Sequence, residues 1–521
     1  MINIKSRLSS GKNLVYLFIF LNIVFRIPSM NNSIPPYFFF CDEGMYINET
    51  FRMLKENNYF QEMFKSGPIN IYPVLILYKI YILLFDKTLD FTELLIFGRL
   101  ILPIIFSALT IIFLDKLVKL IFSNSFLARF IAASLFTFSP YIFGQSRIWY
   151  PDHYQFLATT ALAYYLLKLF YSELNFKSFL PVALSFSVLV SIKYSGLILG
   201  LPIFVVILIK NIDNYKNYNL SFVIKNNLIY LVSGFAILLI INFSAIVNFD
   251  KFLEGFNFNL HNYGGGYKPG WRAFNGFKYY SIFLYLVPTS IFSLPYLLLG
   301  LNKIIKEKKY IELLLFFITP GIICIYLGGL YLIMNRNINF LFTLVLIPVI
   351  YGLVESFKVK NNLLNTINKL TIGIFTSFLI ISFSITLIDD FKVDSRIRAK
   401  NWIFENINEQ PNEIFGINEG CSGSSPLEGL YTTENDREMN NSYKYYVFND
   451  YWDNTLTNGS KRNNIFLLSN HKNSHFYFYM KLDLFETPLN SNLNKLSIKE
   501  GYSLLNSFSG NGPTIFVLKK N

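Results

Sequence analysis

The sequence predicts a polytopic α-helical membrane protein of about eleven spans, followed by a small C-terminal α/β domain. The chain has 521 residues, of which 53% are hydrophobic and only 15% charged, whereas soluble proteins are about a quarter charged. Apolar stretches of roughly 20 residues, enough to cross a bilayer, recur through the first three quarters of the chain, as in 94–114 and 227–247. After Asp389 the composition becomes polar, which divides the chain into residues 1–388 and 389–521.

Charge and metal-ligand composition exclude several other classes. The net charge is +13, but the basic residues lie in short loops between apolar stretches, where they act as orientation signals rather than as a nucleic-acid surface. The three cysteines form no CxxC and the four histidines no HExxH, so no structural zinc site is expected. The first apolar segment lacks a small-residue cleavage site and is interpreted as an anchor.

The first span, 14–27, follows Lys5, Arg7 and Lys12, which places the N-terminus on the inner side of the membrane. Residues 28–70 are therefore expected outside.

The next apolar segment, 71–85, is interpreted as an interfacial helix on the outer surface. Its length of about 22 Å is short of the roughly 30 Å hydrocarbon core. If it crossed, the acidic loop after it would lie inside and the loop with Lys116 and Lys119 outside, against the preference of each.

The remaining spans then alternate so that every lysine-rich loop lies inside. They are expected at 94–114, 126–143, 154–171, 179–192, 195–209, 227–249, 277–300, 311–331, 337–355 and 369–388.

The polar C-terminal region has signals for both helix and strand. Apolar residues at helical spacing predict a helix over 395–407. Strand-like runs follow at 443–448, 464–469 and 514–520. This region is expected to form a mixed α/β domain outside the cytoplasm.

Ionisable residues cluster on the expected outer face. Asp42 and Glu43 lie on the first outer loop, directly after a run of aromatic residues. Arg147 precedes the adjacent pair Asp152 and His153 on the second outer loop.

Three further ionisable positions lie near the same face. His261 and the glycines at 264–266 belong to the fourth outer loop, Lys193 lies where two short apolar segments meet, and Arg336 lies at the outer end of a span. Ionisable groups at membrane depth are costly and are usually functional.

This set of ionisable residues suits the transfer of a sugar from a lipid phosphate. A carboxylate can act as general base on a hydroxyl acceptor. Lysine and arginine can bind a phosphate, and phosphate leaves as a stable anion without a strong general acid. One carboxylate with phosphate-binding cations is a sufficient minimal set.

Several motifs carry a resemblance to a known family. "DEGMY" at 42–46, "FGRL" at 97–100 opening a long span, and "PDHY" at 151–154 resemble the GT-C class of membrane glycosyltransferases. The resemblance is to the group that contains dolichyl-phosphate-mannose–protein mannosyltransferases and the lipid A aminoarabinose transferase. The helix at 395–407 also resembles the segment that leads into the family's terminal domain.

The resemblance implies roles for the acidic residues. Asp42 would be the catalytic base with Glu43 beside it, and Asp152 the second acidic position. The partners would be membrane lipids, a polyprenyl-phosphate sugar donor and a lipid, glycan or protein acceptor. Asp42 and Asp152, here called the two acidic stations, could also bind Mg²⁺ or Mn²⁺. Abundant Asn, Ile and Lys indicate an AT-rich genome and a bacterial plasma membrane.

Each site residue also has a simpler interpretation. The Asp42–Glu43 pair could be a solvated turn, and Asp152 could cap the helix that follows it. Arg99, Arg147, Lys193 and Arg336, assigned here to the donor phosphate, could be interface anchors whose side chains snorkel. His153 and His261, assigned to the acceptor or the loop, could be interfacial partners.

Two other functions compete with the glycosyltransferase. A transporter or flippase would carry charges in broken helices at mid-membrane, and Lys193 fits that pattern. A glycan polymerase or ligase would share the lipid-linked donor but not the early acidic pair.

Overall fold

The structure is a computed structural model of the 521-residue chain. It describes residues 11–31, 41–64, 66–217, 220–264, 271–286, 291–329, 335–358, 362–391, 395–407, 414–416, 445–449, 502–508 and 515–520.

Helices dominate these residues. In the first half they are α2 (Gly11–Arg26), η1 (Ile27–Asn31), α3 (Cys41–Lys55), η2 (Pro68–Asn70), α4 (Tyr72–Phe85), α5 (Phe91–Arg99), η3 (Leu100–Ile105), α6 (Phe106–Ile121), α7 (Phe126–Phe138), α8 (Pro140–Gln145), α9 (Pro151–Tyr171), α10 (Phe176–Ile192), η4 (Tyr194–Leu199), α11 (Gly200–Asn217) and α12 (Leu220–Ile241).

The second half continues with α13 (Phe243–Val247), α14 (Phe249–Gly264), α15 (Trp271–Leu286), η5 (Ile291–Ser293), α16 (Leu294–Lys306), α17 (Tyr310–Leu313), η6 (Leu314–Ile318), α18 (Thr319–Gly328), η7 (Asn335–Leu341), α19 (Phe342–Ser356), α20 (Asn362–Asp390) and α21 (Ser395–Asn406).

The chain is a multi-pass membrane protein by the length and composition of its helices. Among the described residues, seven helical segments are long and apolar enough to span a bilayer: Asn13–Met30, Pro68–Phe85, Phe91–Ile121, Tyr194–Ile212, Tyr310–Gly328, Asn337–Ser356 and Asn365–Ile388. Shorter apolar helices cover Phe126–Phe138, Phe176–Ile192 and Asn227–Ile241. The helical class is as the sequence predicted, while the count of eleven spans stays a prediction.

The span expected at 94–114 is longer in the structure. α5, η3 and α6 form one continuous helical segment, Phe91–Ile121. The π-helical turn η3 contains Pro103, which has no backbone N–H to donate, so the wider turn keeps the segment helical. Asp90 and Glu93 form a capping box at its start, which satisfies the exposed N–H groups there.

Three expected spans are divided. The span expected at 227–249 breaks at Asn242, between the end of α12 and the start of α13. The span expected at 126–143 breaks at Ser139, where α7 ends and α8 begins with Pro140. The expected span 277–300 is shared between α15 and α16, which pack on α18 and α19 respectively. α16 approaches α19 closely, because Gly300 and Gly352 leave no room for a Cβ against the facing backbones.

The segment expected as an interfacial helix, 71–85, coincides with α4. Together with η2 it makes an 18-residue apolar segment, about 27 Å if fully helical, so its length alone no longer argues against a crossing. Leu83 and Leu84 are 84% and 69% exposed and suit a hydrocarbon contact. The interfacial placement stays a prediction.

The C-terminal region contains a four-stranded sheet in the order β1 (Ile414–Gly416), β2 (Tyr445–Asn449), β4 (Ile515–Lys520), β3 (Tyr502–Phe508). β1 and β2 are parallel and the other pairs antiparallel, with an irregularity in register between Leu504 and Asn506. α21 packs on β3 and β4 and buries Ala399 and Ile403 fully. The helix at 395–407 and the strands at 443–448 and 514–520 match expectation, while 464–469 lies outside the described residues.

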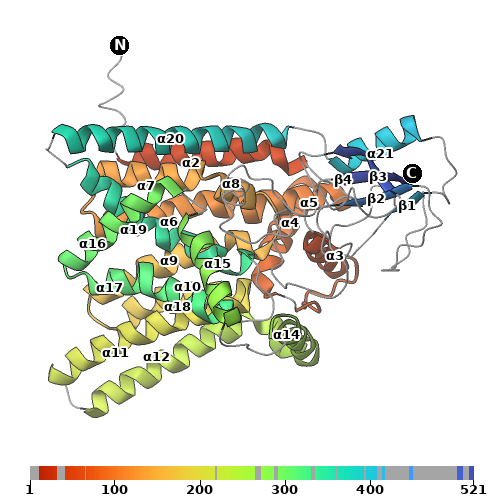
Figure 1. Ribbon diagram of the computed structural model, residues 1–521. Helices are drawn as coiled ribbons and strands as arrows, with labels where there is room; N and C mark the ends of the chain where they lie inside the picture. Colours follow the sequence, from red (N-terminus) through yellow and green to blue (C-terminus); the bar gives the residue numbers. More distant parts are fainter. Residues whose placement is uncertain are drawn as a thin grey trace.

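The arrangement has two distinguishable ends and two flanks (Figure 1). α3, α14 and the sheet with α21 lie at one end of the helical bundle, which we call the α3 end. α2, α7 and α20 lie along one flank, and α11 and α12 along the other. Whether the α3 end is extracytoplasmic stays a prediction.

Candidate functional site

The acidic pair predicted from the sequence lies at the start of α3. Cys41 and Asp42 open the helix, and the structure does not describe their side chains. Glu43 points into the bundle and is fully buried together with Arg99. Arg99 donates from Nε to Glu43 Oε1 at 2.9 Å and from Nη2 to Oε2 at 2.7 Å, a bidentate ion pair.

The same carboxylate binds a second segment. The backbone N–H of Trp149 donates to Glu43 Oε1 at 2.8 Å. The Trp149 ring lies over Gly98, where an added Cβ would come within 2.3 Å of the indole. Glycine at that position therefore admits the indole, and the adjacent Arg99 meets Glu43. The "FGRL" motif thus has a structural reason for both its glycine and its arginine.

Asn70 hydrogen-bonds to several segments around the Glu43–Trp149 contact. It is fully buried, its backbone carbonyl accepts the Trp149 indole N–H at 2.9 Å, and its side-chain oxygen accepts from the Tyr154 hydroxyl. Its Nδ2 donates to the carbonyls of Gly67 at 2.8 Å and Ile192 at 2.9 Å. One amide therefore joins η2, the start of α9 and the end of α10.

Asp152 and His153 occupy the first turn of α9, next to Tyr154, and their side chains are outside the description. α9 begins at Pro151, and its N-cap is Tyr150 without a side-chain cap. The alternative that Asp152 is the cap is therefore wrong, although a carboxylate in a first turn still favours the helix dipole.

Lys193 lies at a break between two helices, as the sequence predicted. α10 ends at Ile192, Lys193 is extended, and η4 begins at Tyr194. Its Nζ donates to Asn337 Oδ1 at 3.3 Å. Asn337 also donates to the Tyr280 hydroxyl at 3.4 Å and is the neighbour of Arg336, whose side chain is not described.

Arg147 occupies a different environment. It is 3% exposed, its Nε donates to the Gly144 carbonyl at 3.0 Å, and its guanidinium lies 5.4 Å from the Phe143 ring centroid. Arg26, fully buried in the first span, lies 5.1 Å from the same centroid and donates from Nε to Ser146 Oγ at 2.6 Å. The structure thus groups Arg147 with Arg26 around the Phe143 ring.

α14 carries His261, whose side chain is not described. Upstream in α14, Phe252 and Phe256 pack edge-on against Tyr194, with ring centroids 5.9 and 6.1 Å apart. This contact brings the helix that bears His261 against the residue that follows Lys193.

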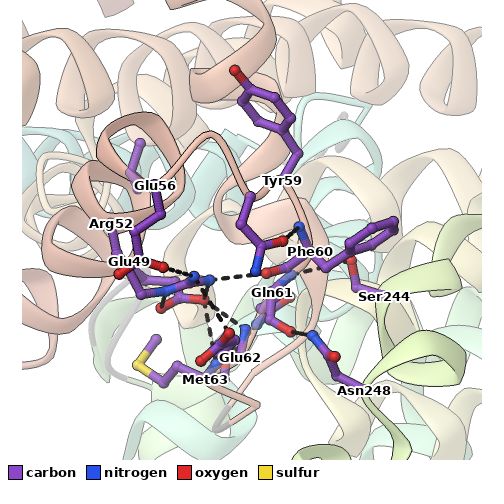
Figure 2. A network of polar contacts seen from close by, with 12 residues as sticks. Glu49, Arg52, Glu56, Tyr59, Phe60, Gln61, Glu62, Met63, Ser244 and Asn248 are labelled. Carbon is purple, nitrogen blue, oxygen red and sulfur yellow. Dashed lines mark hydrogen bonds and ion pairs between the residues drawn. The ribbon is translucent and has the colours of Figure 1, made fainter.

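A second polar network fastens the first loop (Figure 2). Arg52 binds Glu49 in a bidentate pair at 2.9 and 3.0 Å and Glu56 at 2.9 Å. Glu49 Oε1 also accepts the Glu62 backbone N–H at 2.6 Å, and the Phe60 carbonyl accepts from Arg52 at 2.9 Å. This pins the 56–63 loop back onto α3.

The loop is also joined to α13 and α14 (Figure 2). Asn248 donates to the Gln61 carbonyl at 2.8 Å, and Ser244 Oγ accepts the Gln61 N–H at 3.3 Å. Lys251 forms an ion pair with Glu62. α3, the loop and α14 are therefore one hydrogen-bonded assembly at the α3 end.

These ion pairs shift the titration of the groups in the assembly. The hydrogen bonds from Arg52 to Glu49 raise the pKa of Arg52 above its ordinary value. The hydrogen bond from Lys251 lowers the pKa of the Glu62 carboxyl below its ordinary value of 4.5. Both groups keep their charge over the physiological range.

The metal expectation is left untested by the geometry. Among the residues described, no group of three His, Cys, Asp or Glu side chains could hold a metal ion. The side chains of Asp42 and Asp152, the two acidic stations, are not among those described. Binding of Mg²⁺ or Mn²⁺ there stays a prediction.

Sequence reasoning missed Arg26, Asn70, Trp149 and Asn337. For Arg26 and Asn70 a signal existed, since an arginine at the end of a span and an amide inside the apolar run "INIYPVLILY" are costly at membrane depth. Trp149 and Asn337 act through partners distant in sequence, which a single sequence does not reveal.

Comparisons with known proteins found similar solved structures only. The chain is similar to archaeal oligosaccharyltransferase AglB from Archaeoglobus fulgidus, in complex with an inhibitory peptide and a dolichol-phosphate, at 11% identity and TM-score 0.48, covering 84% of this chain and 69% of that one. It is also similar to ArnT from Cupriavidus metallidurans in the apo state, at 10% identity and TM-score 0.48, covering 98% of each chain.

The structure of the same ArnT bound to undecaprenyl phosphate matches at 10% identity and TM-score 0.46, covering 97% of each chain. Both AglB and ArnT are GT-C glycosyltransferases, the class that the sequence motifs resemble. No protein-family model and no curated protein matches the sequence. At these identities, and with TM-scores below 0.5, no residue role is transferred from them to this chain.

Proposed function

We propose that this protein is a membrane glycosyltransferase. It moves a sugar from a polyprenyl-phosphate donor to a lipid, glycan or protein acceptor on the extracytoplasmic face. The observation that supports this most is the buried chain of contacts from Glu43 through Trp149 and Asn70 to Ile192. It fixes, at one end of an apolar bundle, the backbones that carry both acidic stations and Lys193.

Asp42 is the proposed base. It draws the proton from the acceptor as the acceptor attacks the anomeric carbon. The lipid phosphate departs from the opposite face of the sugar, and the configuration at the anomeric carbon is therefore inverted. Glu43 is engaged by Arg99 and by the Trp149 N–H, so it acts as a positioning residue that holds the start of α3. Asp152, at the start of α9, supports the acceptor or its loop together with His153 and His261.

The donor phosphate needs cations at the same membrane surface. Lys193 at the helix break and Arg336 beside Asn337 are the proposed phosphate-binding residues, since Lys193 reaches Asn337. Arg99, which the sequence assigned to the phosphate, is paired with Glu43 instead and is not proposed as a phosphate ligand. Arg147, which lies over Phe143, is proposed as a more distant contributor.

Asp42→Asn tests the mechanism, with release of polyprenyl phosphate from a labelled donor as the readout. Asparagine keeps the shape but cannot accept the proton, so turnover should fall by about 10²–10⁴ while donor binding persists. A folded Asp42→Asn protein with near-normal turnover would rule the mechanism out. Asp86→Asn, an exposed carboxylate after α4, is the matched control and should leave turnover unchanged.

A transporter or flippase is the second candidate, favoured by the interruption at Lys193 between α10 and η4. Charges at broken helices are typical of transporters. Movement of a labelled lipid-linked sugar across proteoliposomes, without release of polyprenyl phosphate, would favour this candidate over the enzyme.

A further inference from the structure

The surface between α7, α20 and the end of α19 is hollowed. It is an apolar groove of about 400 Å³, within the size range of ligand pockets. It is lined by Leu127, Phe130, Ile131, Ser134, Leu135, Phe138, Leu353, Phe357, Ile372, Phe375, Thr376, Leu379, Ile380 and Phe383. We propose that this groove binds one acyl chain of an anionic phospholipid, whose headgroup lies at the lysine-bearing end of α20.

The lining suits a hydrocarbon chain. Ser134 and Thr376 are its only residues with polar side chains, and the Ser134 hydroxyl has no hydrogen-bond partner among the described residues. Such a wall presents almost nothing to hydrate, so an apolar chain is favoured over water.

One end of the groove is closed by aromatic rings. Phe138 and Phe383 meet with centroids 5.3 Å apart. Behind them, Phe383 also contacts Phe143 at 4.8 Å and Phe25 at 5.3 Å. An acyl chain that lies in the groove would therefore end at this cluster.

The opposite end is positively charged. Lys358 directly follows Phe357 of the lining, with a side chain 63% exposed, and Lys369 is exposed one turn before Ile372. Lys358 Nζ forms an ion pair with Glu355 Oε1 at 2.6 Å. Within the described part of the chain, Lys369 has no ion pair. No acidic residue occurs from 356 to 388. Each lysine near a membrane surface attracts anionic lipid.

The length of the groove matches one leaflet. From Ile372 to Phe383 the α20 backbone rises about 16 Å, close to half of the roughly 30 Å hydrocarbon core. The occupant is therefore a lipid of the leaflet on the lysine side, with its tail pointing to mid-membrane.

The donor lipid does not fit this orientation. α20 runs from the lysine-bearing end to α21 and the sheet at the α3 end (Figure 1). A lipid whose phosphate lay beside α3 would meet the groove at its closed end. The proposal is thus independent of the proposed enzymatic function and concerns a different lipid.

The experiment uses the full chain, purified and stripped of lipid. Melting is followed while dioleoyl phosphatidylglycerol or dioleoyl phosphatidylcholine is added in mixed micelles. We expect phosphatidylglycerol to raise Tm saturably and phosphatidylcholine to raise it little. Equal shifts with the two lipids, or displacement of bound phosphatidylglycerol by stoichiometric polyprenyl phosphate, would overturn the proposal.

Variants locate the effect. Thr376→Trp fills the groove from α20, and Ser134→Phe narrows it from α7, so the phosphatidylglycerol shift should disappear in each variant that folds. Ile381→Trp is the matched control, because Ile381 is on α20, 58% exposed and outside the groove, and it should keep the shift. Retention of the full shift in a folded Thr376→Trp or Ser134→Phe protein would contradict the site.

The headgroup contact has its own test. Lys369→Gln should weaken phosphatidylglycerol binding about fivefold, the effect of one lysine near an anionic surface. Lys306→Gln, an exposed lysine in the last turn of α16, should leave it unchanged. Equal loss in the two variants would mean a general charge effect and would overturn the assigned headgroup position.

Discussion

α3 holds its surroundings with ionic contacts of two different kinds. At its start, Glu43 and Arg99 form an ion pair in which both side chains are 0% exposed. Further along, Arg52 binds Glu49, Glu56 and Glu62 with its own side chain 18% exposed. The first pair fixes the helix against the bundle, and the second fixes a loop against the helix.

The difference in burial determines how each contact responds to change. A buried pair loses hydration on both ions, so removing one partner leaves a lone charge in an apolar site and costs more than the pair contributes. A partly exposed network exchanges protein contacts for water at little cost, and salt screens it. The residue beside the proposed base is thus held rigidly, while the 56–63 loop, which contacts α14, is held by contacts that water can replace.

Glu43→Gln should have the largest effect on stability. The new amide can still accept the Trp149 N–H, but Arg99 becomes a buried charge without its counter-ion, which costs about 3–5 kcal/mol of unfolding free energy. Thermal denaturation in detergent, followed by size-exclusion chromatography, measures the loss.

A double variant sharpens this result. Glu43→Gln combined with Arg99→Gln removes both charges and should recover much of the stability that Glu43→Gln alone loses. If the double variant is no more stable than the single one, the cost lies in shape rather than in the lone charge, and the contrast between buried and exposed contacts fails.

The sequence predicted individual residues of the site better than their partners. Glu43 and Arg99 were both marked by their motifs, yet they lie 56 positions apart, and pairing at that separation leaves no periodic signal. Arg99 was accordingly assigned to the donor phosphate, whereas the structure gives it a carboxylate. Glu49, Arg52 and Glu56, by contrast, follow helical spacing, which can be recognised in the sequence.

Helix type was predictable, and helix interruptions were less so. Hydropathy located α2, α9 and α10 within three residues at each end. It passed over the break at Ser139 because the apolar composition continues across Pro140. The break at Lys193 was found, because a charge interrupts the apolar run there.

Arg52→Gln should have an intermediate effect. The guanidinium donates to Glu49, Glu56 and the Phe60 carbonyl, and hydrogen bonds to charged groups contribute about 1.5–3 kcal/mol each when well shielded. Partial exposure reduces the contribution of each bond. We therefore expect a loss of about 1.5 kcal/mol of unfolding free energy, measured as a decrease in Tm.

Arg52→Lys is the matched control. It keeps the charge but not the fork that binds Glu49 through two nitrogens, so it should restore only part of the stability. If Arg52→Gln lost as much unfolding free energy as Glu43→Gln, exposure would not separate the two kinds of contact.

Glu62→Gln should have the smallest effect, and its pH dependence identifies the cause. Lys251 lowers the pKa of Glu62 below 4.5, so the carboxylate stabilises the fold above that value and loses its contribution as the pH falls through the lowered pKa. The Glu62 side chain is 30% exposed, and a pair of this kind contributes about 0.2–1 kcal/mol. The Tm difference between wild type and Glu62→Gln should therefore be small at pH 7, decrease in 1 M salt, and vanish well below pH 4.5.

Glu56→Gln, whose carboxylate binds Arg52 rather than Lys251, is the control for the Lys251 contact, and only Glu62→Gln should increase hydrogen exchange in α14. A Tm difference that persists unchanged at low pH would mean that Glu62 acts through its packing, and the loop would then be held as rigidly as the start of α3.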